Sequence, residues 1–400
     1  MDAMEVLTNL EHLQPFFQPI FSADDHVVIG YEILGRYVND SGVESLGSFF
    51  QDESVPDEYR VEVDNHVLRL ALEKMKDMED EFLIFINRDP NLLMLDHGEG
   101  FLEIVKEYVS EENMSRIVIE LSEKKFDGDM ESLHHLLSYY KTYGIKVAID
   151  HLGADSHLDR ISTLSPQILK VNLEQLKYQG WDTHKDVIAS IGVLARKIGA
   201  TLLFESIETV YQLQFAWRNS GRYYQGFYLA EPNANFINKE QLKDRFKKEC
   251  HSFIVAEKRS LEQKFNKKKQ LQDEIRTIVQ KSKLLSADIE QLKGLAKSLE
   301  AFSFRLYVCD EDGFQTSPNI LRQHSEWIIQ DEYQNKNWSW RPYFLKTIIK
   351  MRNDQKGEFS DPYSDIDTGV TTRTFSIPLN ESEYLFIDLS YDYLYEHDLF

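Results

Sequence analysis

Residues 116–150, RIVIELSEKKFDGDMESLHHLLSYYKTYGIKVAID, contain two short apolar segments separated by an amphipathic one. The segments at 116–121 and 146–150 are rich in β-branched residues and have the length of buried strands. The intervening SLHHLLSYYKTYG has apolar residues at helical spacing. A strand, a helix and a second strand in this order predict parallel pairing of the two strands.

The same alternation extends over about residues 16–232, with amphipathic segments such as VDNHVLRLALEKM between the apolar ones. The other apolar runs are FFQPIF (16–21), VVIGYEIL (27–34), FLIFIN (82–87), QILKV (167–171), TLLFE (201–205) and YYQGFYL (223–229). This repetition predicts an α/β fold, a (β/α) barrel. The first two runs lie too close together for a helix between them, so we expect a hairpin and an irregular start.

Two further segments follow the predicted barrel, and they divide the chain into residues 1–245, 246–299 and 300–400. From about 238 to 299 the composition shifts to Lys, Glu, Gln and Leu without proline. A heptad seam is predicted there from Ile275, Ser282, Ile289 and Ala296 at one position and Ile278, Leu285, Leu292 and Leu299 at another. Such a helix packs on its own barrel or pairs with a second chain. Short alternating strands around one or two helices predict an α+β domain over 300–400.

Charge and cysteine content exclude several classes of protein. The net charge is −22, which disfavours duplex DNA or RNA as a partner. Cys250 and Cys309 are too few for a disulfide framework. The first residues, MDAMEVLTNLEHLQ, lack the basic and apolar regions of a signal peptide. No apolar run approaches the ~18 residues of a membrane span. We therefore expect a cytoplasmic protein.

A polar side chain ends, or closely follows, nearly every predicted barrel strand. These residues are Glu32, Asn87, Glu120, Asp150, Lys170, Glu205 and Gln225. The carboxyl ends of parallel barrel strands meet at one face, so these groups are expected to converge. Four carboxylates at one place repel each other and lose hydration, and bound cations resolve this conflict. Apart from His151 the donors are hard oxygen ligands, which favour Mg²⁺, Mn²⁺ or Ca²⁺.

Residues 18–36, QPIFSADDHVVIGYEILGR, resemble the opening of the EAL family, with Glu32-Ile33-Leu34 in place of Glu-Ala-Leu. The similarity continues in order through FINRDP, IELSE, AIDHLG, LKVNL, FESIE and YYQGF, and covers about residues 12–245. Members of this family are cyclic di-GMP phosphodiesterases with a (β/α) barrel. The resemblance implies cyclic di-GMP as the ligand and divalent metal as the cofactor, Mg²⁺ or Mn²⁺ for turnover and Ca²⁺ or Mg²⁺ for binding.

The resemblance also implies individual roles. One metal would be held by Glu32, Asn87, Glu120 and Asp150, and a second by Asp150, His151 and Glu205. Lys170 would lie beside the attacking water and act with Glu205 and Asp150 in catalysis. The nucleotide would contact Gln18, Leu34, Arg36 and Gln225, with Glu208 at its edge. Glu123 would support the loop that follows Asp150.

Several positions depart from the family pattern. His151 replaces a carboxylate expected on the second metal, Ala154 and Asp155 replace Ser/Thr and Gly, Asn172 replaces Asp, and Ser206 replaces Gly. An imidazole can bind a metal but removes a negative charge. We therefore expect cyclic di-GMP binding to outlast catalysis, in a receptor or a weak phosphodiesterase. A fully active phosphodiesterase that produces pGpG and a non-binding dimeric scaffold are the alternatives.

The segments NWSWRPYF (337–344) and FSDPYSDIDTG (359–369) resemble the Cache and PAS group of sensory domains. This resemblance implies a second ligand site in which Arg341, Tyr363 and Asp388 hold a small zwitterion or acid. The alternative is a structural ion pair in a domain that serves to dimerise the protein. We expect a homodimer that acts on an output protein which the sequence does not identify.

Overall fold

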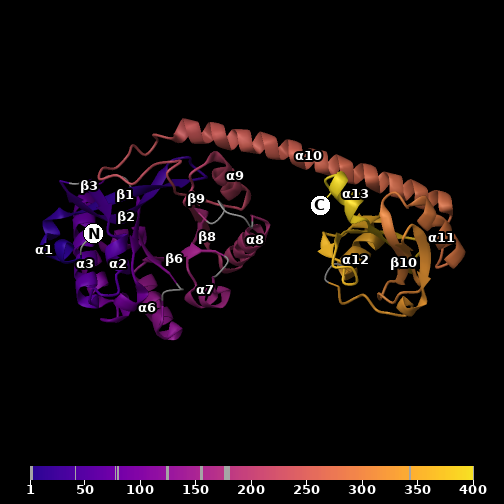
Figure 1. The fold of residues 1–400 in the computed structure, drawn as a ribbon, viewed down its shortest axis with the longest axis horizontal. Coiled ribbons are helices and arrows are strands. Elements are labelled where there is room, and N and C mark those ends of the chain that lie inside the picture. The colour runs from indigo at the N-terminus through magenta and orange to yellow at the C-terminus, as the bar shows by residue number, and fades with distance from the viewer. Residues whose placement is uncertain are drawn as a thin grey trace. The chain divides into compact units, whose positions relative to one another are not determined.

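The computed structural model describes residues 3–40, 42–76, 78, 81–122, 126–153, 156–174, 181–341 and 344–399, with the backbone alone for 181–185. The chain divides into two compact units, residues 1–253 and 254–400. Figure 1 draws the first from indigo to magenta and the second in orange and yellow. Each unit is described by itself below.

Eight strands of the first unit close into a barrel, in the order β1-β2-β4-β5-β6-β7-β8-β9 and back to β1. β1 pairs antiparallel with β2 and with β9, whereas the remaining neighbours in the ring are parallel. The predicted barrel and its opening hairpin are thus confirmed. The strands are β1 (Leu13–Ser22), β2 (Val28–Asn39), β4 (Leu83–Asn87), β5 (Ile117–Leu121), β6 (Lys146–Leu152), β7 (Ile168–Asn172), β8 (Thr201–Glu205) and β9 (Tyr223–Tyr224), with β3 (Gly42–Ser45) added beside β2.

Helices connect the barrel strands and cover the barrel from outside (Figure 1). Asp129 begins α6 by accepting hydrogen bonds from the amides of residues 131 and 132, and Thr209 begins α9 in a capping box with Gln212. The helices of this unit are α1 (Ala3–Thr8), α2 (Gly47–Gln51), α3 (Asp57–Met75), α4 (Pro90–Met94), α5 (Glu99–Tyr108), α6 (Met130–Thr142), α7 (Leu158–Leu164), α8 (Trp181–Ile198) and α9 (Val210–Arg218).

The barrel interior contains an apolar layer to which most strands contribute one residue. The fully buried members of this layer are Ile20, Phe85, Val118, Ala148, Ile168 and Leu203. Side chains of a strand alternate between its two faces, so the residue two positions later also points into the barrel. On five strands that later residue is polar: Asn87, Glu120, Asp150, Lys170 and Glu205. The polar groups therefore form the next layer, toward the carboxyl ends of the strands.

Two tight loops meet beside this polar layer, after β8 and after β9. Gly226 has a φ of 151°, and a Cβ there would lie 2.2 Å from the carbonyl oxygen of Ile207. The Ile207 amide in turn donates to the Gln225 carbonyl at 3.1 Å. Ser206 has a φ of 58°, at the position where the family resemblance predicts glycine. That left-handed conformation costs a non-glycine residue about 1 kcal/mol. The loop after Glu205 therefore has a backbone conformation that suits glycine, although serine occupies the position.

The second unit is an antiparallel sheet covered by helices on both faces. Its strand order is β12-β11-β10-β17-β16-β13. One face packs against helices α10 and α11 through residues such as Ile275 and Leu292, and the other packs against α12 through Phe344 and Met351. The strands are β10 (Ser303–Asp310), β11 (Asn319–Gln323), β12 (Glu326–Gln330), β13 (Glu358–Phe359), β16 (Thr374–Pro378) and β17 (Glu383–Leu389), with a small hairpin of β14 (Tyr363–Ser364) and β15 (Thr371–Thr372). The helices are α10 (Lys243–Ser282), α11 (Ile289–Ser298), α12 (Phe344–Asp354) and α13 (Tyr391–Glu396).

The expectation of a heptad seam along one helix from Ile275 to Leu299 was wrong. α10 ends at Ser282, Lys283 has a φ of 55°, and Asp288 starts α11 by accepting a hydrogen bond from the Gln291 amide. A residue in the left-handed region stops a helix, because the next amide no longer points along its axis. The buried seam residues pack within their own unit. Among the described helices, none is both long and apolar enough to cross a membrane.

Candidate functional site

The polar residues at the barrel mouth surround one fully buried lysine. Lys170 Nζ lies 2.8 Å from Glu120 Oε1, 3.1 Å from Glu32 Oε2, and 3.4 Å from both Asp150 Oδ1 and Glu205 Oε2. Five strands, β2, β5, β6, β7 and β8, thus each contribute one charged group. The convergence predicted from the sequence is present in the structure.

Three amide side chains complete the cluster around Glu32. Asn87 Nδ2 donates to Glu32 Oε1 at 2.6 Å, and Gln225 Nε2 donates to Glu32 Oε2 at 2.6 Å. Gln225 Nε2 also lies 3.0 Å from Gln18 Oε1. These contacts orient the Glu32 carboxylate and leave the amide oxygen of Gln225 buried without a hydrogen-bond donor.

The cluster carries more negative charge than its lysine neutralises. Glu120 Oε2 and Glu205 Oε1 are buried and have no hydrogen-bond or ion-pair partner in the described part of the chain, whereas Glu120 Oε1 and Asp150 Oδ1 face Lys170. Burial, reinforced by Glu32, raises the pKa of Glu120 well above its usual value. Burial and the charge of Asp150 raise the pKa of Glu205 to about 7. Burial alone would lower the pKa of Lys170, but the four surrounding carboxylates raise it. Buried oxygens without donors are what a divalent cation would satisfy.

His151 extends the cluster toward solvent. Its Nδ1 lies 2.6 Å from Asp150 Oδ2, and its side chain is 62% exposed. The hydrogen bond to Asp150 raises the pKa of His151 to about 9. Burial would raise the pKa of Asp150, but Lys170 and His151 bring it below its usual value. Asp150, His151 and Glu205 each offer a ligand atom, and these atoms lie within 4.8 Å of one another, as a shared metal ion requires.

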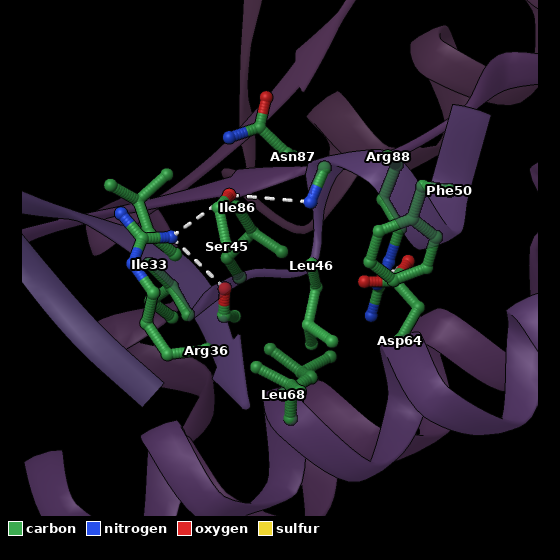
Figure 2. A pocket seen from close by; sticks show the side chains of 14 residues that line it. Ile33, Arg36, Ser45, Leu46, Phe50, Asp64, Leu68, Ile86, Asn87 and Arg88 are labelled. Carbon is green, nitrogen blue, oxygen red and sulfur yellow. Dashed lines mark hydrogen bonds and ion pairs between the residues drawn. The ribbon is translucent and has the colours of Figure 1, made fainter. Parts of the chain in front are cut away.

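Two adjoining cavities open beside the cluster, of about 220 and 200 Å³. The first is lined by Glu120, Asp150 and His151, and the second by Leu34 and Arg36. Both share the lining residues Gly47, Phe50, Asp64, Asn87 and Arg88. Figure 2 shows the second cavity, with Arg36 on one side and the ion pair of Arg88 with Asp64 on the other. The mouth therefore combines buried carboxylates with two guanidinium groups.

The predicted residues are not all brought together. Glu208 is exposed, and its backbone amide donates to Gln212 Oε1 at 2.9 Å. Glu123, with Ala154 and Asp155, lies outside the described residues. Sequence reasoning missed Asp64 and Arg88, which line both cavities. Arg88 follows Asn87 directly in FINRDP, so its position beside a predicted ligand was a usable signal, whereas Asp64 lies in a helix with no comparable signal.

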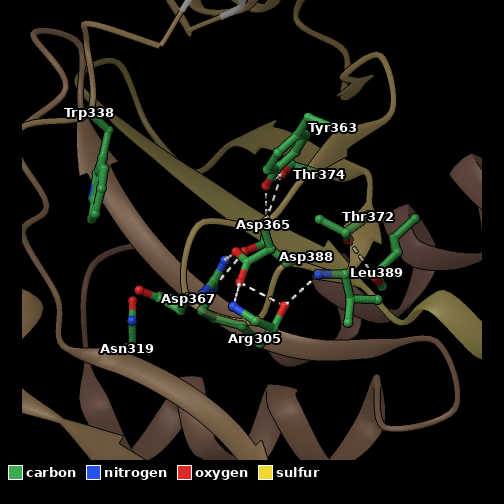
Figure 3. Close-up of polar contacts among 12 residues, drawn as sticks. Arg305, Asn319, Trp338, Tyr363, Asp365, Asp367, Thr372, Thr374, Asp388 and Leu389 are labelled. Atoms are coloured by element: carbon green, nitrogen blue, oxygen red, sulfur yellow. Dashed lines mark hydrogen bonds and ion pairs between the residues drawn. The ribbon is translucent and has the colours of Figure 1, made fainter. Parts of the chain in front are cut away.

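In the second unit, the residues of the expected second ligand site are Arg341, Tyr363 and Asp388. Asp388 is fully buried and its ion-pair partner is Arg305, with Nε 2.6 Å from Oδ2 (Figure 3). Arg305 also pairs with Asp365 and with Asp367, while Thr374 Oγ1 donates to Asp388 at 2.6 Å. A buried carboxylate needs a nearby cation. Arg305 is near Asp388 because their strands, β10 and β17, are neighbours in the sheet.

The two other predicted residues of that site lie around this network. Tyr363 OH lies 3.4 Å from Asp388 Oδ1 and 2.8 Å from Thr374 Oγ1. The guanidinium of Arg341 lies 4.3 Å from the centre of the Trp338 ring.

Binding of Ca²⁺ at the mouth is expected to release protons and to weaken as the pH is lowered from about 8 to about 6. A cation needs ionised Glu205, and protonation competes with it below the pKa of about 7. Calorimetric titration in two buffers of different ionisation enthalpy measures the protons released. The Glu205→Gln variant should lose this dependence near neutral pH. Equal heats in both buffers for the unmodified chain would contradict the expectation.

Comparison with known proteins agrees with this geometry. A family model described as the EAL domain matches residues 2–232, and one described as an EAL-domain associated signalling protein domain matches residues 236–400. YkuI of Bacillus subtilis, an uncharacterized EAL-domain containing protein, is 50% identical over 403 residues, which span 100% of this chain and 99% of YkuI. The probable cyclic di-GMP phosphodiesterase PdeD of Escherichia coli is 23% identical over 54% of this chain and 41% of its own.

Solved structures give the same result. The crystal structure of Bacillus subtilis YkuI in complex with its substrate c-di-GMP and calcium has a TM-score of 0.95 and 49% identity, and covers all of both chains. An EAL-domain protein of Listeria monocytogenes, 22% identical, has a TM-score of 0.51 over 58% of this chain and 94% of its own. At that identity the likeness concerns the fold of the barrel alone.

Proposed function

This chain belongs to the EAL-domain family, and from that premise we propose that its barrel binds cyclic di-GMP together with divalent cations, as a receptor or weak phosphodiesterase. The observation that carries the proposal is that four buried carboxylates share Lys170, while Glu120 Oε2 and Glu205 Oε1 have no partner in the described part of the chain. In addition, YkuI, half identical over its full length, was crystallised with c-di-GMP and calcium.

The donors present fit two divalent ions. Glu32, Asn87, Glu120 and Asp150 would hold one, and Asp150, His151 and Glu205 the other. We propose Ca²⁺ or Mg²⁺ for binding and Mg²⁺ or Mn²⁺ for turnover, because nearly all donors are hard oxygen atoms. Bound there, such ions would lower the pKa of a water molecule and stabilise negative charge on phosphate oxygens.

The remaining residues of the mouth position the nucleotide. Arg36 lines the second cavity and can offer two parallel N–H groups to a phosphate, which a lysine could not. Gln18 and Gln225, already joined by a hydrogen bond, present amide groups from the strands that close the barrel. Lys170 neutralises part of the negative charge of the surrounding carboxylates. In this proposal Lys170 also orients the attacking water, together with Asp150 and Glu205.

Replacing His151 by aspartate is expected to raise any turnover of cyclic di-GMP by about tenfold or more. The change restores a negatively charged ligand between Asp150 and Glu205. Aspartate also tolerates the φ of 56° found at this position. Chromatography of pGpG formed with Mg²⁺ and with Mn²⁺ measures the effect, and His135→Asp, on an exposed face of α6, is the matched control. An unchanged rate would show that low turnover comes from the rest of the loop after Asp150 and not from the metal-binding side chain at position 151.

One pair of assays tests the proposed function. Calorimetry follows cyclic di-GMP binding in the presence of Ca²⁺, and chromatography then seeks pGpG in the presence of Mg²⁺ and of Mn²⁺. Binding without product supports a receptor, and product supports an enzyme. Neither binding nor product would contradict the proposal and support the scaffold. Glu120→Gln should lose binding, whereas Glu131→Gln, exposed on α6, should keep it.

The second unit then regulates or dimerises the barrel. We propose a homodimer in the cytoplasm, a reducing compartment that suits a chain with only two cysteines. Light scattering of the full chain tests the oligomeric state, and a monomeric mass at working concentration would remove dimerisation from the proposal.

A further inference from the structure

The largest of the described cavities, about 410 Å³, lies in the second unit. One wall is the part of α10 that contains Phe265, Lys268 and Arg276, and the other is the segment that leads into β13, residues 356–358. Gln272 Nε2 donates to the Gly357 carbonyl at 2.7 Å and joins the two walls. All lining residues belong to the unit 254–400, so the groove is formed within one rigid sheet-and-helix layer.

This groove is basic in a strongly acidic chain. Residues 243–282 contain 12 Lys and Arg against 6 Asp and Glu, although the whole chain has a net charge of −22. The charged residues of the lining are Lys268, Lys269, Arg276 and Lys356 against Asp273 and Glu358. Glu358 forms an ion pair at 2.9 Å with Lys350, which is not one of the lining residues. The lining therefore presents unneutralised positive charge to the groove.

Lys268 is the cation that most requires a partner. It is half-buried, and among the described residues no carboxylate lies within 4.0 Å of its Nζ. Its Nζ lies 5.4 Å from the centre of the Phe359 ring. Burial and then Arg373 lower the pKa of Lys268, against the weaker opposing effect of Glu358 and Asp361. A partly desolvated ammonium without a direct ion pair is unfavourable, and a bound anion would relieve it.

An aromatic side chain stands at the edge of the same groove. Phe265 is 67% exposed, one turn of helix before Lys268 and Lys269. Because the Phe265 ring is exposed and lies next to cations, a planar ring of a ligand can stack on its face. The groove floor is the buried ring of Phe375, beside Gly357. Charge, ring face and volume together suit a small molecule that has both phosphate groups and a base.

We propose that this groove binds a small phosphate-bearing anion of the nucleoside diphosphate kind, with Lys268 and Lys356 on the phosphates and Phe265 against the base. Such a ligand would give the second unit a sensory role without using the Arg305 network. The phosphates would give Lys268 a direct ion-pair partner, and the base would cover an otherwise solvent-exposed ring.

Calorimetry of the full chain with GDP and with pyrophosphate, in EDTA, tests the proposal. Without divalent ions the barrel mouth cannot offer the metal-dependent binding proposed above, so the two sites are distinguished. We expect both probes to bind, and GDP to bind more tightly. Lys268→Gln and Lys356→Gln should each weaken both probes about tenfold. Phe265→Ala should weaken GDP about fivefold and leave pyrophosphate unchanged.

The matched control is Lys267→Gln, which removes an exposed charge from the same helix outside the groove lining. It should bind both probes as the unmodified chain does, and all four variants should keep the parent melting temperature. The proposal is overturned if neither probe binds. It is also overturned if Lys268→Gln and Lys267→Gln weaken binding equally, because the attraction would then come from the charge of the helix as a whole.

Discussion

Replacement of Lys170 by methionine is expected to lower the free energy of unfolding of the barrel by about 3–5 kcal/mol in metal-free buffer. Among the described residues, Lys170 is the cation that contacts Glu32, Glu120, Asp150 and Glu205 together. Without it, the buried carboxylates must either repel one another or take up protons. Methionine has nearly the same volume, so the change removes charge and leaves packing almost intact.

Urea denaturation in EDTA measures this loss, with Lys197→Met on the exposed face of α8 as the control. The loss should grow as the pH rises, because the carboxyl pKa values in the folded variant lie above those of the unfolded chain. The folded state then binds more protons, and its stability decreases once the unfolded carboxyl groups ionise. Added Ca²⁺ should restore more stability to the variant than to the parent. A variant as stable as its parent at every pH would show that Lys170 does not neutralise the cluster.

Replacement of Asp150 by asparagine is expected to weaken cyclic di-GMP binding in Ca²⁺ by about a hundredfold or more. Asp150 is the residue expected to contact both ions, and its two oxygens face different partners. Oδ2 lies 2.6 Å from His151 Nδ1, and the buried Oδ1 lies 3.4 Å from Lys170 Nζ. Asparagine keeps the shape and one carbonyl oxygen, but it removes the negative charge and replaces the other oxygen by an NH₂ group that cannot bind a cation.

Calorimetry with cyclic di-GMP in Ca²⁺ measures the Asp150→Asn variant beside Asp159→Asn, which changes an exposed carboxylate of α7. Only the former should lose affinity. In EDTA the two variants and the parent should bind equally poorly. If Asp150→Asn bound as tightly as the parent in Ca²⁺, the nucleotide would not depend on ions at this residue.

The barrel and its charged layer could be predicted because both follow from local periodicity. On an apolar barrel strand, a carboxylate two residues after the last apolar interior side chain also points into the barrel, at its mouth. This placement does not depend on how the outer helices pack. Val118 and Glu120 show this on β5, and Ala148 and Asp150 show it on β6. The role of Lys170 as the centre of the cluster needed the coordinates, because its neighbours come from four other strands.

What the sequence did not reveal depends on contacts between distant residues. Asp388 pairs with Arg305, 83 residues away, because β10 and β17 are neighbours in the sheet. The sequence motifs had suggested only that Asp388 holds a small ligand together with Arg341 and Tyr363. The helix break after Ser282 was hidden for a similar reason. The apolar seam continues across it, and the stop depends on the conformation of Lys283 and on the cap supplied by Asp288.

Anomalous scattering from crystals grown with Mn²⁺ and cyclic di-GMP locates the ions that this account requires. We predict one peak among the side chains of Glu32, Asn87, Glu120 and Asp150, and a second, weaker peak beside His151 and Glu205. No peak at the barrel mouth, with nucleotide density elsewhere or absent, would contradict the account.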